Sequence, residues 1–301
     1  MNNELENLTV VVLTHKTNKN TLENCLSLID PNVKIILVEN SNNFLHKEHI
    51  ENKYKNVSIF CSGSNLGYGG GNNIGLKLTK TPYALILNPD VNCKENFFKN
   101  IKEYLNDKID YAIIGCQYEN EENWQPAGFF SNKKNLRDIQ EETNQKLTKV
   151  DWVVGCAMLL NLKKFKSKAI FDENFFFFFE EFDLCKMLKS KNENVYSSKN
   201  LIINHLRLKS SYAEKIYEYD IIKFKNWHYM WSFFYYHKKN EGFLKALYAS
   251  KGRLLRSLFR IFYFSIFNNR KEKLKYSYRF LGLINSIFAK KSWFRINDRE
   301  N

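Results

Sequence analysis

Short apolar runs alternate with amphipathic segments over the first 115 residues. The runs are nearly continuous in apolar character, which is typical of strands buried on both faces. They cover residues 8–13, 33–38, 57–61, 83–87 and 111–115. Apolar residues at helical spacing predict helices between them, at residues 21–29, 44–54, 72–78 and 95–105. The alternation predicts a Rossmann-like α/β domain of three layers, with a mostly parallel sheet between helices.

The pattern changes in the second half of the chain. Residues 117–149 are polar with little periodicity, and we expect a long loop there. Order resumes with an apolar run at 151–160, an aromatic block at 171–188 and a strand-like run at 201–204. After residue 212 only long, aromatic helical runs follow. We therefore predict two parts, an α/β domain at 1–211 and a helical extension at 212–301.

The positive charge is confined to one end of the chain. The 301 residues carry 46 Lys and Arg against 32 Asp and Glu, a net charge of +14. Residues 1–200 hold 25 basic and 25 acidic side chains, whereas residues 201–301 hold 21 and 7. A neutral domain is therefore joined to a basic one. The hydrophobic content of 44% excludes an intrinsically disordered chain, because it can bury enough apolar surface to offset the entropy of ordering.

Cysteine spacing and hydropathy bear on the compartment. The six cysteines stand singly, without a Cys-x-x-Cys pair or zinc-type spacing, so we expect buried thiols in a reducing compartment. The N-terminus lacks the basic and apolar regions of a signal peptide. The longest weakly polar stretch, residues 254–267, falls short of the roughly 20 residues that span a bilayer. We expect a cytoplasmic protein without a transmembrane helix.

A glycine-rich segment, residues 65–75, follows the third predicted strand and leads into a helix. Glycines let the backbone approach a ligand closely, and a helix N-terminus favours an anion such as a phosphate. The segment is not the dinucleotide fingerprint, because Asn72 stands where the third glycine belongs. A nucleotide-phosphate loop and a plain glycine-rich turn both fit the segment taken alone.

Asp90 follows the fourth predicted strand, in the sequence Asn88-Pro89-Asp90. Proline ends the strand and places Asp90 at the carboxyl edge of the sheet, where α/β proteins bind ligands. One Asp together with diphosphate oxygens is a usual way of holding Mg2+ or Mn2+, since hard cations prefer oxygen ligands. An Asx-type turn or a helix cap is the alternative interpretation.

Five consecutive phenylalanines, residues 175–179, run directly into Glu180, Glu181 and Asp183. Carboxylates beside a dense apolar wall have raised pKa values, which suits a general base. If residues 180–189 are helical, Glu180 and Asp183 share a face and Glu181 points elsewhere. The alternative is an acidic first turn that complements the helix dipole.

In order and spacing, these segments resemble the family 2 glycosyltransferases, in particular their bacterial rhamnosyltransferase-like branch, over most of residues 8–211. Residues 10–15 and 25–29 resemble the opening strand and helix of that family. Residues 38–41 (VENS) resemble its Val-Asp-Asn-x-Ser motif, 65–75 its glycine-containing loop, and 87–91 the Asn-Pro-Asp form of its metal-binding Asp-x-Asp.

The second half of the resemblance lies beyond residue 150. Residues 155–158 (GCAM) resemble the acceptor-side strand of the family. Residues 171–184 are similar to its Phe-Asp-Glu-x-Phe-Phe element, which ends in Glu-Asp-x-Asp-Leu. His205, followed by Ser210 and Ser211, resembles its closing His…Ser element.

The resemblance implies a GT-A fold, with a nucleotide-sugar half at about 1–115 and an acceptor half at about 150–211. It implies a donor site made of Thr14, Glu39, Asn65, Gly67, Tyr68, Gly71, Asn72 and Asn88. It implies catalytic carboxylates among Glu181, Glu180 and Asp183, with Glu181 the first choice as base, and acceptor-side residues Gly155, Cys156, Asp172 and Glu173. It implies Asp90 and His205 as ligands of a divalent cation, Mg2+ or Mn2+.

Three positions depart from the family pattern. His15-Lys16 stands where Tyr-Asn is usual, Glu39 replaces the Asp set against the nucleobase, and Glu181 replaces the Asp that usually acts as base. A longer carboxylate still accepts a proton, but its reach changes. The departures leave open a catalytically altered protein that only binds a nucleotide-sugar.

The implied reaction is an inverting transfer of a sugar, rhamnose or another hexose, from a dTDP- or UDP-linked donor. A carboxylate takes the proton of an acceptor hydroxyl, which attacks the anomeric carbon in line. The divalent cation and the amides of residues 65–75 stabilise the leaving nucleoside diphosphate. The implied acceptor is a cell-surface glycan or its lipid-linked precursor, as in lipopolysaccharide or capsule.

The basic C-terminal region combines cations with apolar helical faces. Arg253, Arg256 and Arg260 recur at helical spacing among Leu and Phe residues, and a second apolar run follows at 278–288. Such helices lie in the membrane interface, so we expect peripheral binding to an anionic surface such as the inner face of the plasma membrane. Packing on the catalytic domain or homodimerisation is the alternative. Nucleic-acid binding fits less well, because the apolar runs are too continuous for a solvated groove.

Overall fold

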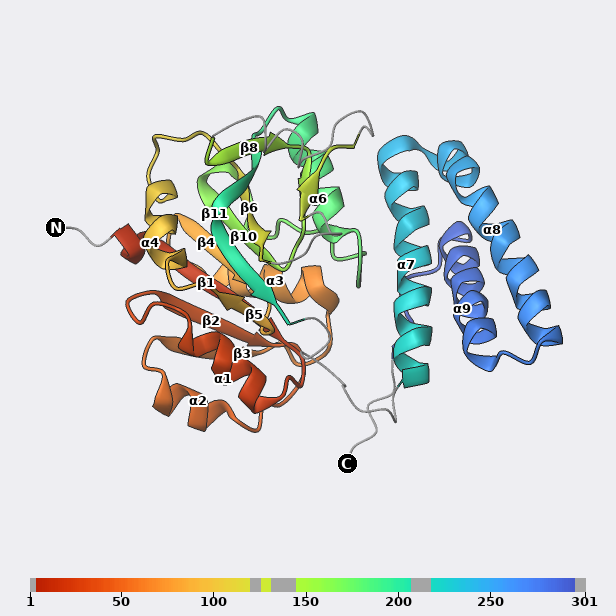
Figure 1. The fold of residues 1–301 in the computed structure, drawn as a ribbon, viewed down its shortest axis with the longest axis horizontal. Coiled ribbons are helices and arrows are strands. Elements are labelled where there is room, and N and C mark those ends of the chain that lie inside the picture. Colours follow the sequence, from red (N-terminus) through yellow and green to blue (C-terminus); the bar gives the residue numbers. More distant parts are fainter. Residues whose placement is uncertain (1–3, 120–125, 131–144, 207–217, 296–301) are drawn as a thin grey trace. The chain divides into compact units, whose positions relative to one another are not determined.

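The computed structural model describes residues 4–119, 126–130, 145–206 and 218–295. The chain divides into two compact units, Met1–Asp172 with Leu184–Tyr212, and Glu173–Asp183 with Ala213–Asn301. The first unit contains the sheet and the second contains three long helices (Figure 1). The aromatic segment Glu173–Asp183 therefore belongs with the C-terminal helices, whereas the sequence pattern assigned it to the α/β domain.

A nine-stranded mixed sheet forms the centre of the first unit. Its strands are β1 (Leu8–Thr14), β2 (Lys34–Glu39), β3 (Val57–Cys61), β4 (Tyr83–Leu87), β5 (Val91–Cys93), β6 (Ile113–Tyr118), β8 (Leu147–Val150), β10 (Ala157–Asn161) and β11 (Val195–His205). They lie in the order β3-β2-β1-β4-β10-β6-β11-β5, and β8 pairs with β11. The first four pair in parallel, so their carboxyl ends meet at one edge of the sheet.

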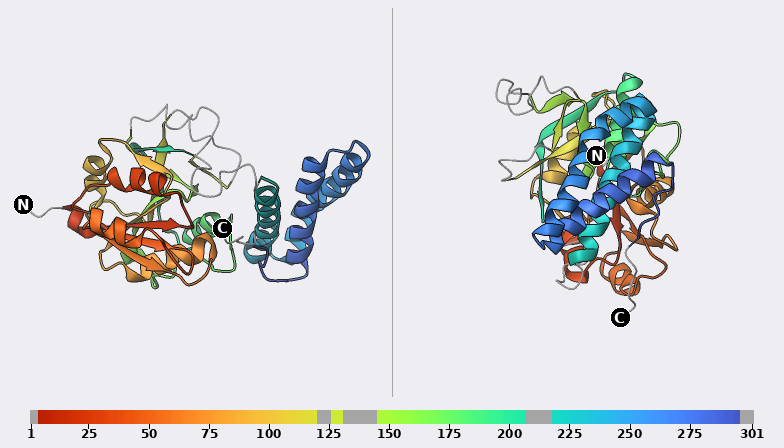
Figure 2. Two further views of the ribbon diagram at one scale, coloured as in Figure 1. Left: turned by 90° about the horizontal axis from the view of Figure 1, so that it is seen from below. Right: turned by 90° about the vertical axis from the view of Figure 1, so that its right-hand side faces the viewer.

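Helices cover both faces of this sheet, as the views in Figure 2 show. One face carries α1 (Lys19–Ser27), α2 (Lys47–Lys53) and α4 (Phe97–Ile101), and the other carries α3 (Gly67–Leu78) and part of α6 (Glu180–Ser190). In β1, Val10 and Val12 pack into the first cluster and Val11 into the second, because side chains alternate between the faces of a strand. The predicted three-layer α/β fold is confirmed.

The structure differs from the sequence prediction in several elements of the first unit. β10 is antiparallel to both β4 and β6, and nothing in an apolar run specifies direction. The polar stretch 117–149 contains the end of β6, the short strand β7 (Ala127–Gly128), which pairs with β9 (Trp152–Val153), and most of β8. Helix α3 begins at Gly67, five residues before the predicted start, because the glycines themselves are helical.

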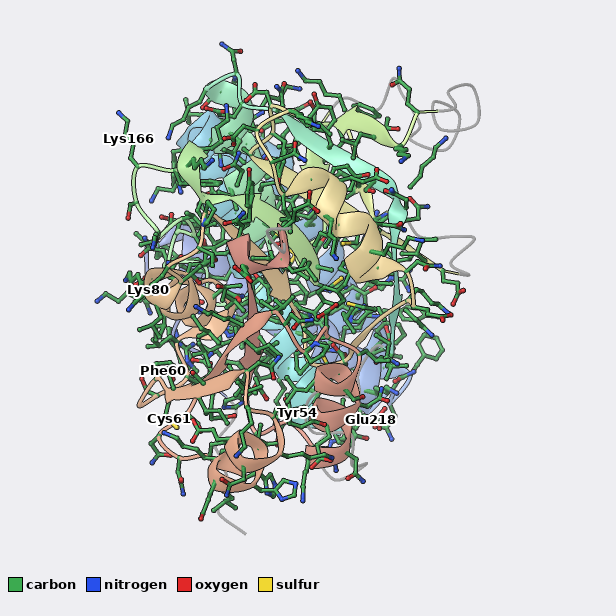
Figure 3. All side chains as sticks on the ribbon, turned by 90° about the vertical axis from the view of Figure 1, so that its left-hand side faces the viewer. Tyr54, Phe60, Cys61, Lys80, Lys166 and Glu218 are labelled. Atoms are coloured by element: carbon green, nitrogen blue, oxygen red, sulfur yellow. The ribbon has the colours of Figure 1, made fainter. Side chains whose placement is uncertain are left out.

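β3 lies at an edge of the sheet, and its outer side chains face solvent. Phe60 is 40% exposed and Cys61 is also exposed; both are labelled in Figure 3. The other five cysteines are buried. The expectation of buried thiols is therefore wrong for Cys61. Cys61 is the last residue of β3 and is exposed, although Val57 and Ile59 on the same face of the strand are buried.

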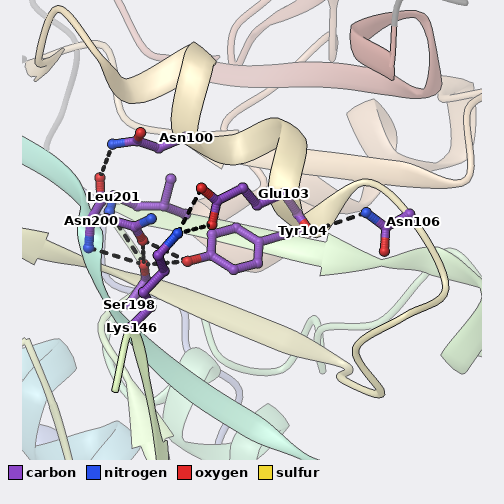
Figure 4. A network of polar contacts seen from close by, with 8 residues as sticks. All are labelled: Asn100, Glu103, Tyr104, Asn106, Lys146, Ser198, Asn200 and Leu201. Atoms are coloured by element: carbon purple, nitrogen blue, oxygen red, sulfur yellow. Dashed lines mark hydrogen bonds and ion pairs between the residues drawn. The ribbon is translucent and has the colours of Figure 1, made fainter. Parts of the chain in front are cut away.

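A hydrogen-bonded bulge redirects β11 toward the end of the sheet. The register of β11 against β6 shifts between Ser197 and Ile202. Within the bulge, Oδ1 of Asn200 accepts hydrogen bonds from Tyr104 and Ser198, both at 2.6 Å, and Asn100 donates to the Asn200 carbonyl (Figure 4). Beyond the bulge, β11 pairs with β5. The network thus helps to place the last residue of β11, His205, opposite Val91.

The second unit is a bundle of α7 (Glu218–Glu241), α8 (Phe243–Ile266) and α9 (Arg270–Ile287). Met230, Phe234, Ala246 and Leu283 form its buried centre. The segment Glu173–Asp183 packs along α7: the rings of Phe175 and Tyr235 lie 4.8 Å apart, and Ser232 donates to the Phe177 carbonyl at 2.9 Å. α9 approaches α7 closely at Gly282, where a Cβ would lie 2.1 Å from the Trp227 carbonyl oxygen.

We predict that Gly282→Ala lowers the free energy of unfolding of the helical unit by about 1–3 kcal/mol, because the added methyl group meets backbone that cannot move aside. Urea denaturation followed by tryptophan fluorescence measures this. Gly252→Ala in α8 is the matched control. Among the described residues, and apart from its own helical turn, no atom lies within 4 Å of its Cβ position. Because alanine is also a better helix former, stability should stay equal or rise by up to about 1 kcal/mol. Equal destabilisation by both changes would contradict the close crossing.

Candidate active site

The residues predicted to bind the donor cluster at the carboxyl ends of the parallel strands. Thr14 ends β1, Glu39 ends β2 and Asn88 follows β4, while residues 65–67 lead into α3. Asn40 donates its backbone N–H to the Thr14 carbonyl at 2.7 Å, so the ends of β1 and β2 are joined. The parallel register therefore gathers side chains that are far apart in the sequence.

Glu39 is fully buried, and one of its two carboxylate oxygens has no hydrogen-bond donor among the described residues. Its Oε1 accepts the backbone N–H of Lys16 at 3.1 Å, and Lys16 adopts a positive φ of 51° there. Its Oε2 is buried and accepts no hydrogen bond from the residues that the structure describes. Burial raises the pKa of Glu39 to about 6. Within the described residues, the Thr14 hydroxyl is likewise buried without a hydrogen-bond partner.

Asn40 fixes the segment before α3, and we did not single it out from the sequence. Its Nδ2 donates to Oδ1 of Asn65 at 3.1 Å and to the Gly67 carbonyl at 2.9 Å, and its Oδ1 accepts the Leu66 N–H at 3.0 Å. Asn65 in turn accepts the Gly67 N–H at 3.0 Å and contacts His15 at 3.2 Å. The motif Val38–Ser41 was the available signal, but only a structure shows which side chain makes these bonds.

The glycines of α3 mainly serve helix–sheet packing. A Cβ on Gly71 would lie 2.3 Å from Leu13, and one on Gly75 would lie 2.3 Å from Val11. Asn72 is fully buried and donates to the Tyr68 carbonyl at 3.0 Å, within its own helix. Gly67 has a φ of 78°, which opens the helix. The anion-binding potential of the segment therefore lies in the first turn of α3, where backbone N–H groups are unpaired by the helix.

Tyr68 connects this first turn to the acceptor-side candidates. Its hydroxyl donates a hydrogen bond to the Gly155 carbonyl, and its ring contacts Phe171 at 6.1 Å. Cys156 is buried: its Sγ contacts the Tyr118 hydroxyl and its carbonyl accepts the Asn88 N–H at 2.8 Å. The side chain of Cys156 thus packs in the interior of the first unit. Of the other acceptor-side candidates, Asp172 is half-buried and Glu173 is exposed.

Asp90 and His205, the two predicted metal ligands, lie side by side. His205 Nε2 is 3.4 Å from Asp90 Oδ1, and the Asp90 carbonyl accepts the Leu206 N–H at 2.9 Å. Asp90 is 2% exposed. Asp90 Oδ1 and His205 Nδ1 make no hydrogen bond with the described residues. A turn also forms here, since Val91 donates to the Asn88 carbonyl at 3.1 Å, so the turn and the ligand interpretations are compatible.

These two side chains fit a divalent cation whose coordination is completed by a ligand. Within the described residues, no group of three or more His, Cys, Asp and Glu gathers to hold a metal. One carboxylate, one imidazole and diphosphate oxygens form a suitable donor set for Mg2+ or Mn2+. Ser210 and Ser211 lie outside the described residues.

The three candidate catalytic carboxylates lie in the first turn of α6, in the second unit, and have different surroundings. Asp183 accepts hydrogen bonds from Lys239 at 2.6 Å and from Asn240 at 3.0 Å. Glu180 is 4% exposed and Glu181 is half-buried, and an Oε2 of each is buried without a hydrogen bond from the described residues. Burial raises the pKa of both glutamates, and the charge of Glu181 adds to the effect on Glu180.

Glu181 faces a pocket of about 340 Å³ within the second unit. The pocket is lined by three residues of the aromatic segment, by two aromatic residues of α7 and by one arginine of α8: Phe178, Phe179, Phe182, Tyr229, Phe233 and Arg253. The last three lie at least 48 positions from Glu181 in the sequence, and no local pattern linked them to it. Of the three carboxylates, Glu181 alone lines this pocket, while Asp183 is neutralised by a lysine.

Comparison with known proteins shows which protein family the sequence matches. Residues 9–167 match the family model described as Glycosyl transferase family 2. The chain is 23% identical over 224 residues to the "Low-salt glycan biosynthesis hexosyltransferase Agl10" of Haloferax volcanii, covering 69% of this chain and 72% of that protein. It is 28% identical over 192 residues to the "Rhamnosyltransferase WbbL" of Escherichia coli, covering 56% of this chain and 71% of the relative.

The fold resembles that of solved glycosyltransferases. The mannosyltransferase PcManGT from Pyrobaculum calidifontis, solved in complex with GDP-Man and Mn2+, superposes with a TM-score of 0.53 at 11% identity. The match covers 95% of this chain and 88% of that one. This likeness shows the GT-A fold.

Proposed function

Because the chain belongs to glycosyl transferase family 2, we propose that it is an inverting hexosyltransferase acting on a nucleoside-diphosphate sugar. The donor is dTDP- or UDP-linked rhamnose or another hexose, and the acceptor is a hydroxyl of a cell-surface glycan or of its lipid-linked precursor. One observation carries the proposal: Glu181, a carboxylate with a raised pKa and a buried open oxygen, lines a pocket that can admit an acceptor.

Glu181 is the general base of the proposed reaction. Its carboxylate takes the proton of the acceptor hydroxyl while that oxygen forms a bond to the anomeric carbon. The bond between this carbon and the diphosphate oxygen breaks on the opposite side, and its electron pair leaves with the nucleoside diphosphate. A raised pKa makes Glu181 a stronger proton acceptor than an exposed glutamate, and its apolar surroundings keep water from competing for the proton.

The first unit would bind the donor. Asp90 and His205 would hold Mg2+ or Mn2+, which when bound neutralises charge on the diphosphate. The N–H groups at the start of α3 add hydrogen bonds to the same anion. Oε2 of Glu39 accepts an N–H or O–H of the base or ribose, which supplies the partner that the buried oxygen lacks among the described residues.

Glu181→Gln should abolish transfer, at least about 1,000-fold in kcat, while donor affinity stays unchanged, because the amide cannot accept the proton. In the wild type, kcat/KM should rise with pH through an apparent pKa above that of a free glutamate, and then level off. Steady-state assays of nucleoside diphosphate release measure both. Glu180→Gln is the matched control, since it changes the neighbouring buried carboxylate and should retain more than about a tenth of the rate.

Near-normal turnover by Glu181→Gln would remove Glu181 from the role of base. Loss of activity in Glu180→Gln alone would assign that role to Glu180. If the wild type binds donors but transfers to no acceptor, the protein is a nucleotide-sugar-binding protein of altered activity.

Asp90→Asn should weaken metal-dependent donor binding about ten-fold or more, because it removes the anionic ligand of the cation. Thermal unfolding with UDP-, dTDP- and GDP-sugars, with and without Mn2+, measures this, since a ligand that binds only the native state raises the melting temperature. Asp107→Asn is the control, as Asp107 is an exposed carboxylate paired with Lys163. The assignment fails if the Mn2+ titrations of Asp90→Asn and wild type coincide.

We further propose that α8 binds an anionic membrane surface. Among the helices that the structure describes, none has both the length and the hydropathy to cross a bilayer. α8 instead presents an apolar outer stripe of six residues, each 63–79% exposed: Leu244, Tyr248, Leu255, Phe259, Phe262 and Ile266. Exposed Lys251, Arg256 and Arg260 lie on the same helix. Apolar side chains flanked by cations fit a surface of acyl chains and anionic headgroups, and two such basic faces would repel each other in a dimer.

Phe259→Ser together with Phe262→Ser should lower binding to vesicles that contain phosphatidylglycerol about ten-fold or more, because two large apolar side chains are removed from the outer stripe. Co-sedimentation with anionic and with neutral vesicles measures this. Leu45→Ser, which removes an 86% exposed leucine elsewhere in the chain, should have no effect. Binding that ignores lipid charge and salt would contradict the proposal, and so would a dimer that buries the stripe in sedimentation experiments without vesicles.

A further inference from the structure

The pocket beside Glu181 contains two opposite charges that do not neutralise each other. Glu181 and Arg253 both line it, yet within the described residues no ion pair joins them, and Arg253 has no acidic partner. By contrast, Lys239 and Asp183 in the same unit pair at 2.6 Å. A cation and a carboxylate held apart in one pocket leave each available to a different group of a ligand.

Resting on the function proposed above, we propose that this pocket is the acceptor site and that it selects an anionic saccharide. Arg253 binds a phosphate or carboxylate of the acceptor, the aromatic walls contact the apolar faces of its sugar ring, and Glu181 receives the hydroxyl that reacts. The two charges thus fix the two ends of one sugar unit. The proposal names the chemical class of acceptor and assigns Arg253 as the residue that recognises it.

The aromatic walls are held in a costly conformation, which indicates a shaped binding surface. Phe178 and Phe179 have φ angles of 69° and 70°, a region that costs bulky residues about 1–3 kcal/mol each. The centres of their rings lie 5.8 and 5.6 Å from the centre of the Tyr229 ring, and the ring centre of Phe179 lies 6.0 Å from that of Phe233. The packing around α7 stabilises the strained pair. The result is a set of ring faces around a space large enough for one sugar.

The guanidinium of Arg253 is positioned for anion recognition. It lies 4.2 Å from the centre of the Phe233 ring, and stacking of this kind orients the planar group while leaving its N–H donors free for other partners. A planar fork of donors binds phosphate or carboxylate through two parallel hydrogen bonds. Arg253 is exposed, so anion binding requires no uncompensated burial of its charge before the ligand arrives.

Saturation-transfer NMR on the full chain tests the inference with three probes that share a glucose ring: glucose 1-phosphate, glucuronic acid and methyl glucoside. We expect either anionic probe to bind at least about ten-fold more tightly than the neutral one, with Arg253→Gln abolishing that preference. Arg253→Lys should retain part of it, because the charge remains but the fork is lost. Lys245→Gln, which removes a cation from α8 outside the pocket, should leave binding within about two-fold of wild type.

The two anionic probes distinguish the source of the charge. A preference for glucose 1-phosphate indicates a phosphate-linked acceptor, and a preference for glucuronic acid indicates an acidic polysaccharide; both support the inference. Equal binding of all three probes, or anionic binding unchanged in Arg253→Gln, overturns it.

Donor-induced thermal stabilisation, measured on the same preparations, separates this inference from the proposed function. If donors stabilise the protein but Arg253→Gln changes no probe, the acceptor inference alone fails. If no donor stabilises it but the anion preference depends on Arg253, the pocket binds anionic saccharides and the transferase proposal fails. In turnover assays, Arg253→Gln should raise the KM of an anionic acceptor about ten-fold while the KM of the donor stays constant.

Discussion

The free-energy cost of burying carboxylate oxygens without hydrogen bonds constrains both groups of candidate residues, those at the strand ends of the first unit and those in the first turn of α6. Glu39, Asp90, Glu180 and Glu181 each place a buried oxygen where no described residue donates a hydrogen bond. An oxygen buried without a hydrogen bond costs about 1–3 kcal/mol, because burial removes it from water. At Asp90 the imidazole of His205, 3.4 Å away, offsets part of that cost. A fold keeps these groups only if the surrounding structure is stiff enough to prevent their return to solvent. The parallel strand ends hold Glu39 and Asp90, and α6 with its aromatic wall holds the two glutamates.

Asp183 lies in the same helical turn as Glu180 and Glu181, but its carboxylate is hydrogen-bonded and its charge is neutralised. It accepts two hydrogen bonds, from Lys239 and Asn240, and the cation lies over the ring of Phe175 at 5.8 Å. The three carboxylates are within four positions of each other, yet one is satisfied and two are not. Pairing thus distinguishes Asp183, which joins the aromatic segment to α7, from Glu180 and Glu181, each of which has a buried oxygen without a hydrogen bond from the described residues. Sequence alone could not separate them, because the partners of Asp183 lie more than 50 positions away.

The sequence predicted the elements whose cause is local. Strands β1 to β4 follow from continuous apolar runs, and the positions after them follow from the rule that parallel strands end at one edge. The antiparallel direction of β10 depends on its neighbours β4 and β6, and no local pattern encodes that choice. The early start of α3 has a similar reason: glycine lowers helix propensity, but Gly71 and Gly75 are helical because only they allow close contact with Leu13 and Val11. The pocket residues Tyr229, Phe233 and Arg253 were missed because tertiary packing, not spacing, brings them to Glu181.

The family match and the pocket occupy different parts of the chain, and this separation has a functional consequence. The matched region, residues 9–167, contains the strand ends, the start of α3 and Asp90, which are proposed to bind the donor, whereas the second proposed metal ligand, His205, lies outside it. The pocket, by contrast, is formed entirely by residues 178–253. Most groups proposed to bind the donor therefore lie in the matched region, whereas the proposed base Glu181 and the proposed acceptor pocket lie beyond it. The basic charge follows the same division, since the net +14 arises in residues 201–301 and includes Arg253. In the proposed function, substitutions in the helical unit would change the binding of an acceptor or a surface and leave the strand ends intact, because the proposed donor residues and the pocket residues lie in different units.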